Sequence, residues 1–356
     1  METGPSPSGV RPARGGSPTS SGYGEDPTMT LIDGIEVDTA LVEQLGLSLE
    51  DVVSIFDRQL QGEHPPINEL CGRIEEYRGK MLRPTLVLLS GLVVEGGRLG
   101  NEHSVAAAVV EMIHMATLVH DDVLDEAEMR RRGRTINSLH GNEMAVMLGD
   151  YLISNAFHLC STLEQPWVSL ELGSVTNTLC EGELIQLFNR NNTCLDLATY
   201  MTIVEKKTAS LIGASCRLGS KLSGSSEDVA GCLERFGRKS GVAFQITDDV
   251  LDLTGEQEVV GKSVGRDLEK GKLTLPMILG LGHAEDVVQE ATRVKIDARD
   301  LVGLRAVLDE SGSIEQSIGI ASKLVSEAKA ELAGLPESPS REMLCMLADG
   351  ILDRKF

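Results

Sequence analysis

The sequence has few aromatic residues and no long apolar run. Aromatic side chains make up 3% of its 356 residues, with a single tryptophan, so a core must be built mainly from Leu, Val, Ile, Ala and Met. These residues, without strand-like alternation, favour helices. The longest apolar stretches, such as 86–94, fall well short of the roughly 18 residues that a membrane span needs. No transmembrane segment is therefore expected.

The sequence also lacks an excess of positive charge and any Cys-x-x-Cys pair. A formal net charge of −21 argues against nucleic-acid binding and against adhesion to an anionic membrane. The seven cysteines are scattered, as is typical of small core residues in a reducing compartment. We therefore expect a soluble, cytoplasmic protein with no nucleic-acid partner.

The chain divides into a leader and one long helical region. Residues 1–28 are rich in Gly, Pro and Ser and are predicted to be disordered, although Arg11 and Arg14 leave a transit peptide as an alternative. From about residue 36 to 356 the apolar pattern is helical, and Ser48 is a plausible capping residue. Helices are predicted near 48–60, 67–78, 103–124, 142–163, 167–190, 196–220, 226–254, 273–281, 298–309, 313–334 and 339–353. No stretch alternates as a strand does, so the sequence predicts an all-α helical bundle.

One acidic pentapeptide occurs twice in the chain. Asp121-Asp122-Val123-Leu124-Asp125 and Asp248-Asp249-Val250-Leu251-Asp252 are identical, and each closes an apolar run. In a helix, the first and last aspartates of each copy lie on one face, one turn apart. Paired carboxylates suit Mg²⁺, which takes one or two of them and completes its shell with water and substrate phosphate. The alternative, two solvated acidic helix ends, explains one copy better than two.

Cationic residues accompany both acidic motifs. Lys80 and Arg83 lie in a predicted turn between Gly79 and Pro84, where two cations can bind a phosphate without a metal. The other candidates for the same site are His114, Arg130, Arg131, Lys207, Thr208, Gln245, Lys262 and Lys272. In so acidic a chain, this gathering of cations beside the aspartates indicates a site for a phosphorylated substrate.

These motifs, in this order, resemble the trans-polyprenyl diphosphate synthase family. The matching segments are Gly79-Lys80-x-x-Arg83-Pro84, the aspartates 121–125 with Arg130-Arg131, Lys207-Thr208, Phe244-Gln245-x-x-Asp248-Asp249-x-x-Asp252, and Lys262 with Gly271-Lys272. The resemblance covers about residue 36 to the C-terminus. It implies one domain of antiparallel helices around a deep central cavity, a homodimer and three Mg²⁺ per site.

The resemblance also implies roles for individual residues. The metal ligands would be Asp121, Asp122, Asp125, Asp248, Asp249 and Asp252, with Asp248 the main ligand of the second motif. The allylic diphosphate would be held by Arg130, Lys207 and Lys272, and isopentenyl diphosphate by Lys80, Arg83, His114 and Arg131. Thr208, Gln245 and Lys262 complete the substrate-binding set. The sequence departs from the family at Met81, where a basic residue is common, and at Arg132, which replaces a glycine.

The function implied is Mg²⁺-dependent condensation of isopentenyl diphosphate with an allylic primer. Ala116 and Thr117 are small where short-chain members of the family carry an aromatic residue, so the growing tail would pass to Met112 and Phe157. The helical spacing and these small residues predict a long all-trans product of about six to ten isoprene units. Two alternatives remain: a class I terpene cyclase, and a catalytically silent subunit of a heteromeric synthase. The exact product length, the primer and the downstream pathway stay open.

Overall fold

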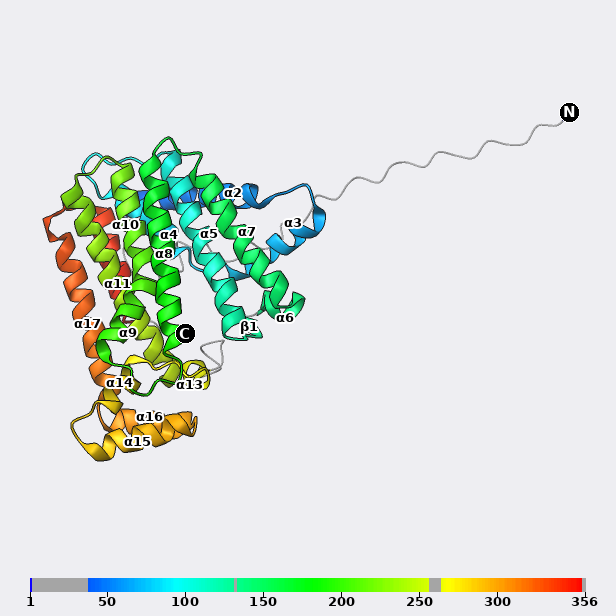
Figure 1. Ribbon diagram of the computed structural model, residues 1–356. Helices are drawn as coiled ribbons and strands as arrows, with labels where there is room; N and C mark the ends of the chain where they lie inside the picture. The colour runs from blue at the N-terminus through cyan, green and yellow to red at the C-terminus, as the bar shows by residue number, and fades with distance from the viewer. Residues whose placement is uncertain (2–37, 131–132, 256–263, 354–356) are drawn as a thin grey trace.

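The computed structural model describes Met1 and residues 38–130, 133–255 and 264–353, and it confirms an all-α fold (Figure 1). The first half contains α2 (Thr39–Leu60), α3 (Pro65–Gly72), η1 (Arg73–Tyr77), α4 (Leu82–Leu92), α5 (Asn101–Leu124), β1 (Met129–Arg130), β2 (Gly133–Arg134), α6 (Ile136–His140), α7 (Asn142–Cys160) and α8 (Pro166–Phe188). The second half contains α9 (Leu197–Val204), η2 (Glu205–Ala209), α10 (Ser210–Leu222), α11 (Glu227–Thr254), α13 (Arg266–Glu269), α14 (Leu275–Leu281), α15 (Asp286–Asp297), α16 (Leu301–Glu310), α17 (Ser313–Glu331), η3 (Leu332–Gly334) and α18 (Pro339–Asp349).

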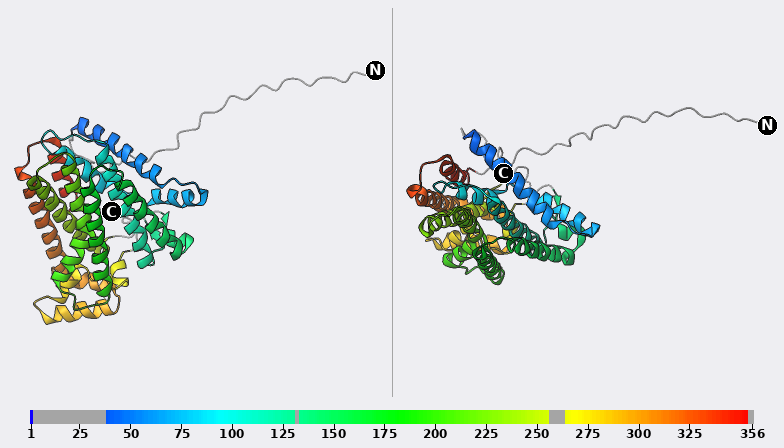
Figure 2. Two further views of the ribbon diagram at one scale, coloured as in Figure 1. Left: turned by 45° about the horizontal axis from the view of Figure 1, so that its top comes forward. Right: turned by 90° about the horizontal axis from the view of Figure 1, so that it is seen from above.

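The long helices run side by side and bury an aliphatic core (Figures 1 and 2). Helix α5 packs mainly against α4 and α7, and α11 packs against α10 and α17. Helices α15 and α16 lie across the lower end of the bundle in Figure 1. Helix α5 leads into β1 and α11 leads toward α13, and both of these are labelled at that same end. The fold therefore brings the two acidic motifs to one end of the molecule.

Glycines allow the central helices to approach closely. A Cβ atom at Gly237 of α11 would lie 2.7 Å from the carbonyl oxygen of Ile212 on α10. A Cβ atom at Gly241, one turn later, would lie 2.7 Å from the Cα of Ala209. Larger side chains at these positions would separate α11 from α10 and η2. The glycines thus keep the helix that carries the second acidic motif close to the segment that carries Lys207.

The structure adds α4, α6 and α13 to the predicted helices and corrects other details. Helix α2 begins at Thr39, because Asp38 caps it by accepting hydrogen bonds from the N–H groups of Ala40 and Leu41, so Ser48 lies inside the helix. Strands β1 and β2 form a two-residue antiparallel pair, too short to produce an alternating pattern. Helix α15 was not predicted, because few of its residues are buried and its Val287 and Val294 are exposed.

The seven cysteines are all free, and none of the helices described is long and apolar enough to cross a membrane. Residues 2–28 of the predicted leader lie outside the described residues, as do Arg131, Arg132 and Lys262.

Candidate active site

The first acidic motif lies among cations that come from distant parts of the chain. The Lys272 Nζ donates to Asp125 Oδ2 at 2.6 Å, and Arg190 Nη2 donates to Asp125 Oδ1 at 2.9 Å. The Lys207 Nζ lies 3.5 Å from Asp121 Oδ1. Burial alone would raise the pKa of Asp125, but these three cations together hold it below its usual value. The predicted metal ligands Asp121 and Asp125 are thus paired with Lys207 and Lys272, which are predicted to bind the allylic diphosphate.

Asp122, the middle carboxylate, faces a different set of partners. Arg130 donates to it through both Nε and Nη2, at distances of 2.7–3.0 Å, and the Asp122 side chain is 3% exposed. The Arg130 guanidinium also lies over the ring of Tyr77, whose hydroxyl accepts a hydrogen bond from the Ile136 N–H at 3.0 Å. Asp122 and Arg130 therefore fasten the β1 segment to α5. Roles for them in binding metal or diphosphate stay predictions.

Asp249 of the second motif ends a buried chain of hydrogen bonds. Thr208 Oγ1 donates to Gln245 Oε1 at 2.9 Å, and Gln245 Nε2 donates to Asp249 Oδ1 at 2.9 Å. The Tyr200 hydroxyl donates to Asp249 Oδ2 at 2.7 Å. Burial raises the pKa of Asp249 to about 8, although the hydrogen bonds from Tyr200 and Gln245 oppose this shift. Both predicted substrate-binding residues, Thr208 and Gln245, are thus linked to a carboxylate of the motif.

The other two aspartates of the second motif lie in different surroundings. Asp252 accepts hydrogen bonds from the backbone N–H groups of Arg266 and Asp267, which begin α13. Burial, followed by the charge of Asp267, raises the pKa of Asp252 to about 7. Asp248 is half-buried, and its charge acts on both Asp267 and Arg83. Through Asp248, the second motif therefore interacts electrostatically with Arg83 of the predicted isopentenyl diphosphate pocket.

Lys207 owes its position to a local change in helix geometry. It lies in η2, a π-helical turn between α9 and α10, and such turns are frequent at functional sites. Its Nζ donates to Gln186 Oε1 at 2.9 Å and forms an ion pair with Glu183. Burial alone would lower the pKa of Lys207, but Asp121 and Glu183 raise it, so the side chain stays charged. Gly182 permits this contact, because the backbone of η2 packs directly against it.

Arg83 and Lys80 differ in exposure. Met81 adopts a left-handed conformation (φ 51°) and α4 begins at the next residue, so Arg83 lies in the first turn of that helix. Lys80 is exposed, whereas Arg83 is half-buried and its Nε has no hydrogen-bond partner among the described residues. Burial lowers the pKa of Arg83, and the charges of Glu111 and Asp248 oppose that shift. An arginine with an unused donor suits an anionic ligand.

The carboxylates fit magnesium, but only together with a substrate. Within the described ranges, no three His, Cys, Asp or Glu side chains gather closely enough to hold a metal ion by themselves. Magnesium, however, usually takes one or two carboxylates and fills its octahedron with water and substrate phosphates. Asp121 in the last turn of α5 and Asp125, the residue that caps its C-terminus, provide such a pair of hard oxygen donors. The donor set therefore suits a magnesium ion bridged to a diphosphate.

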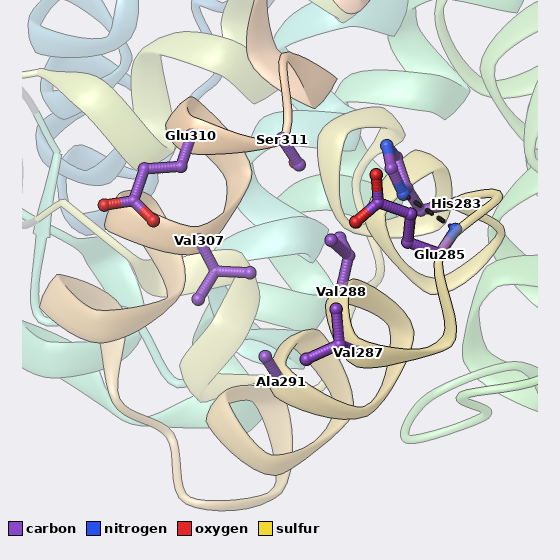
Figure 3. Close-up of a pocket in the computed structure, with 8 residues that line it drawn as sticks. All are labelled: His283, Glu285, Val287, Val288, Ala291, Val307, Glu310 and Ser311. Carbon is purple, nitrogen blue, oxygen red and sulfur yellow. Dashed lines mark hydrogen bonds between the residues drawn. The ribbon is translucent and has the colours of Figure 1, made fainter.

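The predicted product-length residues lie in two environments. Met112 and Ala116 on α5 are fully buried, whereas Thr117 and Phe157 are half-buried. The predicted deep central cavity and the role of these residues in it stay predictions. A pocket of about 420 Å³ lies elsewhere, between the start of α15 and the end of α16 (Figure 3). None of the residues that line it belongs to the acidic motifs.

Several residues of this site were absent from the sequence prediction. They are Arg190, Glu183, Gln186, Tyr200, Asp267 and Glu111. Apart from Asp267, which lies in the cation-rich segment 261–272, none belongs to a repeated or cation-rich segment, so no local pattern marks them. They reach the motifs across long sequence separations, such as 65 residues from Arg190 to Asp125. Partners at such separations become visible only in the folded chain.

Comparison with known proteins identifies the family. The family model described as polyprenyl synthetase matches residues 64–302, well over half of the chain. The chain belongs to this family. The resemblance seen in the motifs is therefore confirmed, and the chain is a prenyltransferase.

Two curated relatives and one solved structure illustrate the similarity. Octaprenyl diphosphate synthase of Escherichia coli (strain K12) is 35% identical over 294 residues, which cover 82% of this chain and 90% of the relative. Heptaprenyl diphosphate synthase component 2 of Bacillus subtilis (strain 168) is 33% identical, with 86% and 89% covered. A polyprenyl synthase of Caulobacter crescentus CB15, solved with calcium and isoprenyl diphosphate, is 30% identical with a TM-score of 0.83, and 89% of this chain and 97% of that chain are covered.

Proposed function

We propose that this prenyltransferase condenses isopentenyl diphosphate with an allylic diphosphate and releases a long-chain all-trans polyprenyl diphosphate. The observation that carries the proposal is the pairing of Asp121 and Asp125 with Lys207 and Lys272 at one end of the bundle. Carboxylates and cations in one site can bind a metal and a diphosphate together. The names of the octaprenyl and heptaprenyl relatives support a long product.

The residues divide the chemistry between two substrates. Asp121, Asp125 and Asp248 would hold Mg²⁺, about three ions per site, which supplies Lewis-acid stabilisation of the departing diphosphate when bound. Lys207 and Lys272 share the negative charge that develops as the allylic carbon–oxygen bond breaks.

Arg83, with Lys80, holds isopentenyl diphosphate so that its double bond can attack the allylic carbon. The new carbon–carbon bond leaves a cation, which loses a proton to the released diphosphate. The calcium and isoprenyl diphosphate bound to the Caulobacter relative support this use of a divalent metal. We further propose that residues 36–356 form one catalytic domain that acts in the cytoplasm.

The test is turnover by the purified chain alone with labelled isopentenyl diphosphate, an allylic primer and Mg²⁺. Asp121→Ala and Asp248→Ala should each lower turnover by several orders of magnitude with the helical circular dichroism spectrum unchanged. Asp286→Ala, which removes an exposed carboxylate at the start of α15, is the control and should stay active. Near-wild-type turnover in either motif variant would refute the metal assignment.

The same assay separates the two alternatives. A catalytically silent subunit would show no turnover until a second chain is added, a relevant outcome because the Bacillus relative is named as one component of its enzyme. A terpene cyclase would convert the allylic diphosphate to a hydrocarbon without isopentenyl diphosphate. Release of a longer linear diphosphate by this chain alone excludes both.

We also propose a homodimer formed through α7 and α8. These helices expose several large apolar side chains, and exposed apolar surface marks protein interfaces. They are Met144, Met147, Leu170, Leu184 and Phe188, and Phe188 is 86% exposed. Light scattering after size exclusion should give twice the mass of one chain. Phe188→Asp should shift the protein to the monomer, whereas Val302→Asp, on an exposed valine of α16, should not.

A further inference from the structure

An arginine outside the family motifs contacts the first acidic motif. Arg190 lies just beyond the end of α8, and its Nη2 donates to Asp125 Oδ1 at 2.9 Å. Both Nη atoms also lie 3.3 Å from the carbonyl oxygen of Leu124, the last residue of α5. A helix C-terminus attracts a cation, which adds to the attraction of the carboxylate. The guanidinium is therefore held against the end of the motif from two directions.

Arg190 also has a hydrogen-bond donor that no group of the described residues accepts from. Its Nε is buried and has no hydrogen-bond partner in the parts of the chain that the structure describes. A buried donor normally finds an acceptor, and a guanidinium suits the oxygen atoms of a phosphate. The unused Nε thus indicates an anionic ligand close to Asp125.

The loop that carries Arg190 is fastened to the loop that carries Lys272. The next residue, Asn191, adopts a left-handed conformation, and its N–H donates to the Gly271 carbonyl oxygen at 2.7 Å. Gly271 has a φ of 69°, and a Cβ atom there would lie 2.1 Å from Asn191 Oδ1. The two cations that flank Asp125 therefore keep a fixed spacing, because their loops are bonded to each other.

Arg190 and Lys272 compete with magnesium for the carboxylate of Asp125. Arg190 and Lys272 neutralise the carboxylate, so a magnesium ion that approaches it alone meets two positive charges. A diphosphate relieves this repulsion, because its oxygen atoms can accept the hydrogen bonds of both cations. The metal and the diphosphate should therefore strengthen each other's binding by the same factor.

We propose that Arg190 is a diphosphate-binding residue that couples the binding of magnesium to the binding of diphosphate. It pairs with Asp125 when no diphosphate is bound, and it transfers its hydrogen bonds to diphosphate oxygens when the metal takes the carboxylate. This inference rests on the proposed function, since it assumes that Asp125 is a metal ligand. Arg190 weakens the binding of magnesium alone and strengthens the binding of diphosphate.

The experiment is calorimetric titration of the full chain with MgCl₂ alone, with inorganic diphosphate alone, and with each in the presence of the other. Arg190→Ala should bind magnesium alone about threefold more tightly, because one competing cation is gone. The same variant should bind inorganic diphosphate in the presence of magnesium about tenfold more weakly, because a charge-assisted hydrogen bond is lost. The coupling factor is the ratio of the magnesium affinities measured with and without diphosphate. This ratio should be smaller in the variant than in the wild type.

Lys270→Ala is the matched control. Lys270 lies two residues from Lys272 and pairs with the exposed Glu126 at 2.9 Å, so its removal changes the net charge equally without touching Asp125. This variant should retain the wild-type coupling factor. Thermal unfolding of each variant checks the fold, and Arg190→Gln replaces Arg190→Ala if the alanine variant does not fold.

Two results would overturn the role of Arg190. Wild-type coupling in the Arg190 variants would show that the residue takes no part in it, while the proposed function would stand. A loss of affinity for both ligands together would show that Arg190 only supports the loop. If the wild-type chain bound no diphosphate in the presence of magnesium, the proposed function would fail as well.

Discussion

Gly182 on α8 lies directly against the backbone of Lys207. A Cβ atom at Gly182 would come within 2.7 Å of the Lys207 nitrogen and within 2.8 Å of the Lys206 Cβ. The π-helical turn that presents Lys207 to Asp121 therefore depends on the absence of a side chain on the neighbouring helix. This contact links a glycine outside every motif to the predicted diphosphate site.

Gly182→Ala should therefore impair both stability and turnover. The added methyl group must push η2 away from α8, and overpacking of this kind costs roughly 1–3 kcal/mol of unfolding free energy. Urea denaturation and steady-state kinetics measure the two effects. Gly173→Ala on the same helix is the control, because nothing lies within 4 Å of its added Cβ. That variant should be more stable than the wild type by about 0.5–1 kcal/mol, and equal behaviour of the two variants would contradict the packing argument.

Tyr200→Phe should destabilise the second acidic motif. The substitution removes the donor 2.7 Å from Asp249 Oδ2 and leaves a buried carboxyl oxygen without that bond. The expected loss is about 1–3 kcal/mol of unfolding free energy, measured by urea denaturation without metal. Tyr151→Phe, on a half-buried tyrosine of α7, controls for loss of a hydroxyl and should change little. An unchanged stability of Tyr200→Phe would show that this hydrogen bond contributes nothing.

Arg83→Ala should separate the two substrate pockets. If Arg83 contacts only isopentenyl diphosphate, the KM for that substrate should rise about 10–150-fold, which corresponds to a lost charge-assisted hydrogen bond of roughly 1.5–3 kcal/mol. The KM for the allylic primer should change far less. Steady-state kinetics with each substrate varied in turn measure both constants, and Lys272→Ala should show the reverse preference. Equal effects of Arg83→Ala on both constants would refute separate pockets.

Ala116→Phe should shorten the product. The aromatic ring would block a tail that grows along α5 from the acidic motif, while the first condensation continues. Product sizing by chromatography, with a farnesyl or geranylgeranyl primer, gives the answer. Because Ala116 is fully buried, the variant should also lose about 1–3 kcal/mol of unfolding free energy. Thr117→Phe, at the half-buried neighbour, provides a second variant, and an unchanged product from both would remove the support for a long chain.

Glu331→Gln should weaken the contact between α17 and α11 and lower the free energy of unfolding in a pH-dependent way. Hydrogen bonds from Lys239 at 2.9 Å and Arg235 at 2.8 Å hold the pKa of Glu331 below its usual value of 4.5. A carboxyl group with a lowered folded pKa adds stability above its unfolded pKa and loses it as the pH falls through its folded pKa. The variant should lose about 0.5–1 kcal/mol at pH 7, and the difference should shrink as the pH falls below 4.5 and vanish only below the lowered folded pKa of Glu331. Urea denaturation at several pH values, with the exposed Glu337→Gln as control, tests this.

The sequence alone was sufficient to predict the class of fold and to mark the two acidic motifs. An aliphatic, aromatic-poor composition with helical periodicity predicted an all-α bundle, since these are local properties of the chain. The two identical pentapeptides predicted acidic faces, because the spacing of Asp121 and Asp125 places both on one side of a helix. The element boundaries were predicted less accurately, and α15, in which only Thr292 and Ile296 are buried, was missed.

Only the tertiary structure distinguished the two copies of the pentapeptide. Asp122 pairs with Arg130, whereas Asp249, its counterpart, accepts hydrogen bonds from Tyr200 and Gln245. Asp125 pairs with Lys272 and Arg190, whereas Asp252 is held by the backbone N–H groups of α13. Identical residues have identical local preferences, so their different partners come from residues as far as 147 positions away in the chain. The packing of the helices determines which groups reach each carboxylate. This packing depends on contacts between distant parts of the chain, so a local sequence pattern cannot predict it.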